Sequence, residues 1–169
     1  MIIISQADIT NIRTEAIVSP TNGLFINNKG ASYSIVKAAG KEVENEIKEY
    51  KAKHSSLKEG DFYKTSGGKL IRNAVKTIYH AVINMTPNGN ASVYSINSSM
   101  NKILNAAVES KLKSITFTGL GTGCCCLDKK IIATNMMDNA KKYCGLLTIN
   151  IVDLDKQTIE AFNESLYKD

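Results

Sequence analysis

Short apolar runs with strand character alternate with longer amphipathic helical patterns along nearly the whole chain. Strands are predicted over residues 2–5, 16–18, 62–65, 77–83, 114–118 and 146–152. With the helical patterns between them, the order is roughly ββα, ββα, βα, βα. This alternation predicts a mixed central sheet with helices on both faces, which is a three-layer α/β/α fold.

Four segments carry the apolar period of an amphipathic helix. In the first, charged residues fill one face, and the opposite face carries Ile35, Ala39, Val43, Ile47 and Tyr50. The same spacing recurs within residues 100–108, 132–143 and 159–166. We expect one helix in each segment.

The length and composition suit one globular domain spanning residues 1–169, with 43% hydrophobic and 22% charged residues. The longest apolar runs are too short to span a membrane. Met1 is followed at once by a predicted strand, so no secretory signal is expected. Three of the four cysteines are adjacent, and neighbours rarely pair, so no disulfide framework is expected. An intracellular location, cytoplasmic or nuclear, follows.

The net charge of +5 mildly favours an anionic partner. The lysines are scattered, however, without a basic run or interleaved aromatic residues. Nucleic acid is therefore not the expected partner. Residues 86–92 are the one long surface loop that the composition predicts within the domain.

Two loops stand where ligands collect in such sheets, which is beyond the carboxyl ends of the strands. The first, SPTNGLFINNKGAS, covers residues 19–32, and the second, GLGTGCCCLDKK, covers residues 119–130. The second loop fails both Gly-rich phosphate-loop patterns on spacing. Its backbone N–H groups could still form an anion-binding nest ahead of a helix, and a plain connecting loop is an equal alternative.

Three cysteines in a row, Cys124 to Cys126, are poor zinc ligands, because contiguous side chains do not converge on one metal. His54, His80 and Cys144 offer no matching spacing, so no metal is expected. A cysteine nucleophile needs a histidine or a helix N-terminus to activate it, and the latter is available here. Packing of small apolar side chains behind the loop is the favoured interpretation, and a reactive thiol stays open.

The positions of three other polar side chains predict their roles. His80 lies on the strand face of Ile78 and Val82, as a hydrogen-bonded core residue would, and His54 is expected to be solvated. Asp8 follows an apolar strand, where either an N-cap or a ligand carboxylate would stand. Taken alone, Asp8 is better explained as an N-cap.

Taken together, four segments resemble the macro domain, the ADP-ribose-binding and Appr-1''-p processing family. ADITNIRTEAIVSPTN resembles the family's G-D-I-T followed by D-A-I-V-N-A-A-N, and KGASYSIVKAAG resembles its helix entry G-V-x-x-A-I-x-x-A-A-G. VKTIYHAV and SITFTGLGTGCCCLDKK resemble the strand ending in I-H-x-V and the segment S-I-A-F-P-A-I-S-T-G-I-Y-G-Y-P. The resemblance covers nearly the whole chain, with the four segments in the family's order.

The resemblance implies a role for each matching residue. Asp8 would accept a hydrogen bond from the adenine amino group, with the Ile9 N–H beside it. Asn22 would hold the distal ribose, and the segment approaching that ribose and the diphosphate would be Gly30, Ala31 and Ser32. The diphosphate would be wrapped by main-chain N–H groups of Gly121, Thr122, Gly123, Cys124, Cys125 and Cys126. Leu127 takes the place of a residue that covers the distal ribose, and Leu154 the place of one that covers the adenine.

The sequence departs from the family pattern at several positions. Ser32 stands where the hydrolase branch has an aspartate, and Asn28-Lys29-Gly30 replaces three glycines. SPTN, residues 19–22, looks more like the histone-variant macro domain, which binds without hydrolysing. Cys126 replaces a glycine, which adds bulk and restricts positive φ angles.

These features predict a module that binds free ADP-ribose or mono-ADP-ribosylated protein. One alternative is a hydrolase that removes ADP-ribose from protein or cleaves an ADP-ribose ester or 1''-phosphate. Asn22 is its only candidate catalytic residue, so enzymatic activity stays open. A second alternative is a degenerate fold that serves as a protein or nucleic-acid contact module. No cofactor and no membrane association are expected.

Overall fold

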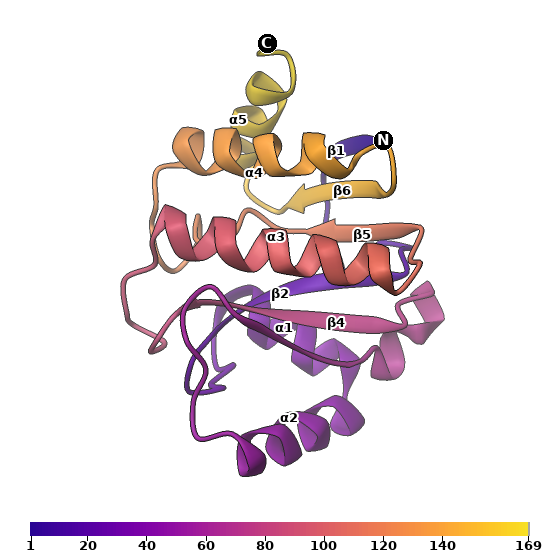
Figure 1. Ribbon diagram of the computed structural model, residues 1–169, viewed down its shortest axis with the longest axis vertical. Coiled ribbons are helices and arrows are strands. Elements are labelled where there is room, and N and C mark those ends of the chain that lie inside the picture. Colours follow the sequence, from indigo (N-terminus) through magenta and orange to yellow (C-terminus); the bar gives the residue numbers. More distant parts are fainter. Residues whose placement is uncertain (169) are drawn as a thin grey trace.

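The computed structural model describes residues 1–168 and contains a mixed six-stranded sheet between helices (Figure 1). The strands lie in the order β1-β6-β5-β2-β4-β3. Only β3 pairs in the antiparallel direction, with β4. The strands are β1 Ile2–Gln6, β2 Ala16–Asn22, β3 Phe62–Ser66, β4 Thr77–Asn84, β5 Ser114–Phe117 and β6 Thr148–Asp153.

Helices cover both faces of this sheet, which confirms the predicted α/β/α class. The helices are α1 Gly30–Ala39, α2 Lys41–Lys53, α3 Val93–Glu109, α4 Lys129–Tyr143 and α5 Lys156–Leu166. Two short 3-10 helices, η1 Ile9–Asn11 and η2 Gly68–Asn73, lie between strands. α1 and α2 pack on one face, α3 and α4 on the other, and α5 packs beside α4 at the β1–β6 edge (Figure 1). Among residues 1–168, no helix combines the length and apolar character needed to cross a membrane.

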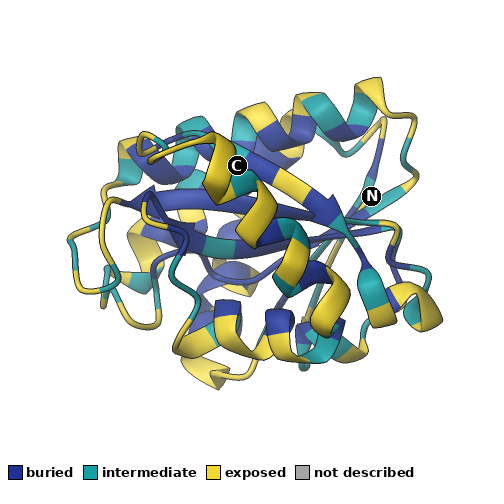
Figure 2. Cartoon of the chain, turned by 90° about the horizontal axis from the view of Figure 1, so that it is seen from below, coloured by how far each residue is buried: buried dark blue, intermediate teal, exposed yellow. Residues whose placement is uncertain are grey.

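The alternation of side chains along β2 divides the interior into two cores. Ala16 and Val18 point into the core beneath α3 and α4, whereas Ile17 points into the core beneath α1 and α2. Figure 2 shows that buried residues follow the strands, whereas exposed residues lie on the outer faces of the helices. Because helices cover both faces, the loops at the carboxyl ends of the strands are where a ligand site is expected.

The expectation of one helix from Ile35 to Tyr50 is wrong, because Gly40 divides it into α1 and α2. Gly40 has φ 87°, a left-handed conformation that glycine adopts without steric cost. Its N–H donates to the Val36 carbonyl and ends α1. The apolar period continues across Gly40, so the period alone does not show that the helix ends there.

β2 is longer than predicted and includes the first four residues of the expected loop at 19–32. Ser19 and Thr21 are buried, and β2 pairs with β4 along its whole length. Backbone pairing with a buried neighbour therefore outweighs the weak strand propensity of this polar segment. The expected loop at 86–92 is confirmed and lies between β4 and α3.

The core role expected for His80 is confirmed. The side chain is fully buried, its Nε2 lies 3.0 Å from Thr65 Oγ1, and its ring stacks on Tyr63. Burial without a charged partner lowers the pKa of His80 to about 3. His54 is exposed, as expected, and stacks on Tyr50.

Candidate functional site

A cavity of about 620 Å³ opens at the carboxyl ends of β2, β4, β5 and β6. Its walls come from residues 7–9, the end of β2, residues 26–34, residues 83–87, residues 118–129 and residues 153–158. The volume lies within the usual range for small-molecule sites. Both loops singled out in the sequence therefore meet at one place.

The cavity brings together most of the residues that the resemblance implied. Those that line it are Asp8, Ile9, Asn22, Gly30, Ala31, Ser32, Gly121, Thr122, Gly123, Cys124, Cys125 and Leu154. Cys126 and Leu127 do not line it. Leu127 packs instead against the core, where its side chain and Ile96 lie directly beneath Gly121.

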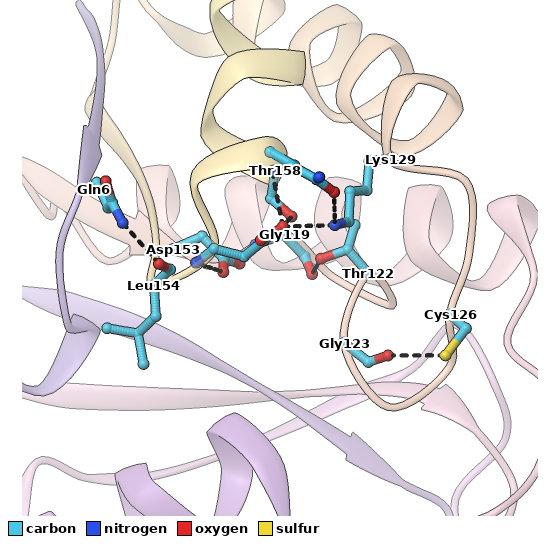
Figure 3. A network of polar contacts seen from close by, with 11 residues as sticks. Gln6, Gly119, Thr122, Gly123, Cys126, Lys129, Asp153, Leu154 and Thr158 are labelled. Carbon is cyan, nitrogen blue, oxygen red and sulfur yellow. Dashed lines mark hydrogen bonds and ion pairs between the residues drawn. The ribbon is translucent and has the colours of Figure 1, made fainter.

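The loop after β5 carries unpaired main-chain donors at residues that line the cavity. The N–H groups of Thr122, Cys126 and Leu127 donate to carbonyls within the loop. Across residues 1–168, those of Gly123, Cys124 and Cys125 donate to no protein acceptor. Figure 3 shows the loop folded back on itself through the Thr122 hydroxyl and the Cys126 thiol. Three successive unpaired N–H groups form a nest suited to an anion.

The N-terminus of α1 forms the opposite wall of the cavity. Its N-cap residue, Lys29, makes no side-chain cap hydrogen bond, and the first residues of the helix, Gly30 to Ser32, line the cavity. Ser32 Oγ donates to the Lys29 carbonyl over 3.2 Å. The N–H groups of a first helical turn lack partners within the helix, and the helix dipole adds positive potential there. This wall is therefore a second place for an anion.

Lys29 is held at the rim of the cavity. Its Nζ donates to Asn88 Oδ1 over 2.6 Å, which joins α1 to the loop between β4 and α3. The cavity stays open beside it. Lys29 therefore does not plug the site, although it replaces a glycine of the family pattern.

Asp8 caps the 3-10 helix η1 and also lines the cavity. Its Oδ1 accepts from the Thr10 N–H over 2.9 Å and from the Thr10 hydroxyl over 2.7 Å, so Asp8 caps η1. The same side chain lines the cavity. A carboxylate has a second oxygen, which remains available to a ligand.

Asn22 organises the loop that follows β2. Its Nδ2 donates to the Ile26 carbonyl over 2.7 Å, and its Oδ1 accepts from the N–H groups of Leu24 and Ile26. Phe25, inside this turn, is held at φ 61°. A side-chain amide carries two N–H donors, so one remains for a ligand in the cavity.

The end of the cavity near β6 is fixed by a polar network (Figure 3). Asp153 Oδ2 accepts from the Gly119 N–H over 3.2 Å, which ties the β5 loop to β6. Gln6 donates to the Leu154 carbonyl over 2.9 Å and leaves the Leu154 side chain 71% exposed at the rim. The Leu154 side chain therefore offers an apolar contact at the rim of the cavity.

Lys129 and Asp155 form an ion pair at the same end, with a nitrogen–oxygen distance of 2.7 Å. The hydrogen bond from Lys129, together with those from Thr158, lowers the pKa of Asp155 to about 2. Asp155 is therefore ionised and occupied as the N-cap of α5. It is unsuited to act as a base.

Several lining residues were missed in the sequence, among them Thr118, Asp153 and Thr158. Thr118 follows β5 and Asp153 is the last residue of β6, so the rule that ligands collect beyond strand ends was a usable signal for both. Thr158 lies in the first turn of α5 and offered no such signal. Thr118 Oγ1 is buried with no hydrogen-bond partner in the described chain.

The carboxylates of the lining are engaged in local hydrogen bonds. Among residues 1–168, those that line the cavity are Asp8, Asp153 and Asp155, and no histidine lines it. Desolvation raises the pKa of Cys125, so this thiol stays protonated. No cluster of side chains within residues 1–168 could hold a metal ion.

Comparison with known proteins agrees with this geometry. A family model described as "Macro domain" matches residues 18–136. A protein of Sulfurisphaera tokodaii is 30% identical over 95% of this chain and 86% of its own. Histone macroH2A1.1 of Capsaspora owczarzaki is 26% identical over 95% of this chain and 45% of its own. A mutant of the Oceanobacillus iheyensis macrodomain with ADPR superposes with a TM-score of 0.84 at 22% identity, covering 96% and 90% of the two chains.

Proposed function

This chain belongs to the macro domain family, and we propose that it binds ADP-ribose, free or attached to a protein, in the cavity at the strand ends. On this proposal the whole chain, residues 1–169, works as one such module. An intracellular location, cytoplasmic or nuclear, belongs to the same proposal and is favoured by the absence of a cysteine pattern for disulfides in the sequence.

The observation that carries the proposal is the pair of N–H sets that face one cavity. The unpaired groups of Gly123, Cys124 and Cys125 lie on one wall, and the uncapped first turn of α1 lies on the other. A diphosphate between them would receive hydrogen bonds from both sides without any lysine or arginine. A single phosphate cannot use both sets equally well.

The two ends of the cavity suit the two ends of ADP-ribose, which are an adenosine and a ribose without a base. Asp8 and the exposed Leu154 lie at one end, where an adenine would find an acceptor for its amino group and an apolar surface. Asn22 and Ser32 supply an amide and a hydroxyl for the hydroxyl groups of a ribose. ADP-ribose therefore matches the cavity in both chemistry and polarity.

Binding is favoured over hydrolysis because the cavity offers no general base. Ser32 occupies the position where an aspartate would stand in the hydrolase branch, and its hydroxyl donates to Lys29. The carboxylates that line the cavity already accept hydrogen bonds, either as helix N-caps or from the loop after β5. Water activation would then depend on orientation alone, which supports at most slow turnover.

The decisive experiment is isothermal titration with ADP-ribose, ADP, AMP and ribose 5-phosphate. We expect ADP-ribose to bind more tightly than AMP by about 100-fold, because only the former reaches both N–H sets and the second ribose site. Absence of heat with ADP-ribose at high protein concentration would rule the proposal out.

Hydrolysis is tested separately with a substrate protein that carries a labelled mono-ADP-ribose. The proposal predicts retention of the label together with measurable binding of the modified protein. Release of label that disappears in Asn22→Ala would instead favour the hydrolase.

A further inference from the structure

The three adjacent cysteines have three different environments. Cys124 is exposed and lines the cavity. Cys125 is half-buried, packs against the core, and lies 3.5 Å from Asn84 Nδ2. Cys126 is exposed, but its thiol is directed to the Gly123 carbonyl and does not line the cavity. One thiol of the triplet is therefore both accessible and inside the site.

The Cys124 thiol lies where the two walls of the cavity approach each other. A Cβ built on Gly30 would stand 3.0 Å from Cys124 Sγ, so the sulfur already touches the start of α1. Gly30 and Cys124 also belong to the two groups of unpaired main-chain N–H donors at the proposed diphosphate site. A group added to this sulfur would therefore be attached at the cavity wall, next to the first residue of α1.

We propose that Cys124 is a thiol-modification site, at which a low-molecular-weight disulfide such as glutathione disulfide forms a mixed disulfide that blocks the ADP-ribose cavity. The inference rests on the proposed function and adds a regulation of the same site. On this proposal the ligand and the modifying group compete, because the diphosphate and a group attached to the Cys124 sulfur would both lie in the part of the cavity that Cys124 and Gly30 line.

The chemistry is a thiol–disulfide exchange. The Cys124 thiol loses its proton to water, and the resulting thiolate attacks one sulfur of glutathione disulfide. A new sulfur–sulfur bond forms on Cys124 as the reagent's own bond breaks, and the released glutathione thiolate takes up a proton. Glutathione disulfide is the oxidant, and excess thiol reverses the step.

The other thiols are less suited to this role. Cys125 is half-buried, and desolvation keeps it protonated, which lowers its reactivity. Modification of Cys126 would place the added group outside the cavity. Cys144 is the C-cap of α4, at the opposite end of that helix from the loop after β5. Its thiol is directed to the Lys141 carbonyl. These differences make Cys144 and Cys126 matched controls.

The experiment treats wild-type protein, Cys124→Ser, Cys126→Ser and Cys144→Ser with glutathione disulfide. Adducts are located by peptide mass spectrometry, and ADP-ribose affinity is measured by titration before treatment, after it, and after dithiothreitol. We expect treatment to weaken binding at least about tenfold in wild type, Cys126→Ser and Cys144→Ser, with recovery on reduction. Cys124→Ser should show no treatment effect relative to its own untreated affinity. Bound ADP-ribose should also slow the labelling of Cys124.

The possible results distinguish failure of the Cys124 inference from failure of the proposed function. An adduct on Cys124 that leaves affinity unchanged, or labelling confined to other cysteines, overturns the inference while the proposed function stands. Loss of affinity in treated Cys124→Ser also overturns it. If untreated protein does not bind ADP-ribose at all, the proposed function itself fails, and the untreated titration identifies that case.

Discussion

Gly30 and Cys124 meet across the cavity, with only 3.0 Å between the position of a Cβ on Gly30 and the Cys124 sulfur. Gly30 also has φ 64°, a conformation that costs an alanine about 1–2 kcal/mol. We expect Gly30→Ala to lower the free energy of unfolding by about this amount and to weaken ADP-ribose binding at least about tenfold. Urea unfolding and isothermal titration measure the two effects.

Gly123→Ala is the matched control for that change. A Cβ on Gly123 meets nothing within 4 Å, and this residue contributes through its N–H group, which alanine keeps. Affinity within about twofold of wild type is expected. If Gly123→Ala and Gly30→Ala weakened ADP-ribose binding equally, the contact between residue 30 and the Cys124 sulfur would not explain the loss of affinity.

Asp8→Asn separates capping of η1 from ligand recognition. The asparagine keeps one oxygen for the Thr10 N–H but replaces the second oxygen by an NH₂ group, which repels an amino group of the ligand. We expect about tenfold weaker binding of ADP-ribose, since a hydrogen bond to a charged acceptor is lost. The melting temperature should stay close to that of wild type. Asp8→Ala loses the cap as well and should melt lower.

Leu154→Phe should tighten binding of ADP-ribose about three- to tenfold. The Leu154 side chain is 71% exposed at the rim, and its backbone is held by Gln6, so an aromatic ring there could stack on a base with little new strain. The affinity for ribose 5-phosphate, which has no base, serves as the control and should not change. Tighter binding of both ligands would show that the phenylalanine ring does not act by stacking on the adenine.

His80 should make the fold sensitive to mild acid. Its pKa is about 3 in the fold and about 6.5 in the unfolded chain, so between these values only the unfolded chain takes up a proton. The stabilisation is complete above pH 6.5 and is lost as the pH falls below it. The free energy of unfolding should drop by about 2 kcal/mol between pH 7 and pH 5. His80→Gln, which does not titrate, should lose this slope in urea unfolding curves.

Asn22→Ala should loosen the loop after β2 rather than the whole fold. The side chain of Asn22 supplies the acceptor for the N–H groups of Leu24 and Ile26 and a donor to the Ile26 carbonyl. Without it, hydrogen exchange at Leu24 and Ile26 should accelerate by at least about tenfold, whereas exchange in β2 should not. Equal acceleration throughout β2 would show that Asn22 stabilises the sheet instead.

The fold class and the two site loops could be predicted from the sequence because both depend on local patterns. Alternating strand and helix periods require helices on both faces of a sheet, and parallel strands bring their carboxyl-end loops to one rim. The residues of those loops that matched the family pattern line the cavity, except Cys126 and Leu127. The break at Gly40 was not predicted because the apolar pattern continues across it. The extension of β2 was not predicted because residues 19–22 are polar and are held in the strand by pairing with β4.

The sequence by itself thus determined the strands, the helical layers and the edge at which the cavity opens, since apolar periodicity is set by neighbours in the chain. Only the tertiary structure decided which thiol of the triplet is exposed within the cavity, that Leu127 packs into the core, and that Lys29 is held aside by Asn88. These outcomes depend on contacts between segments that are distant in sequence. Such contacts exist only after the chain has packed.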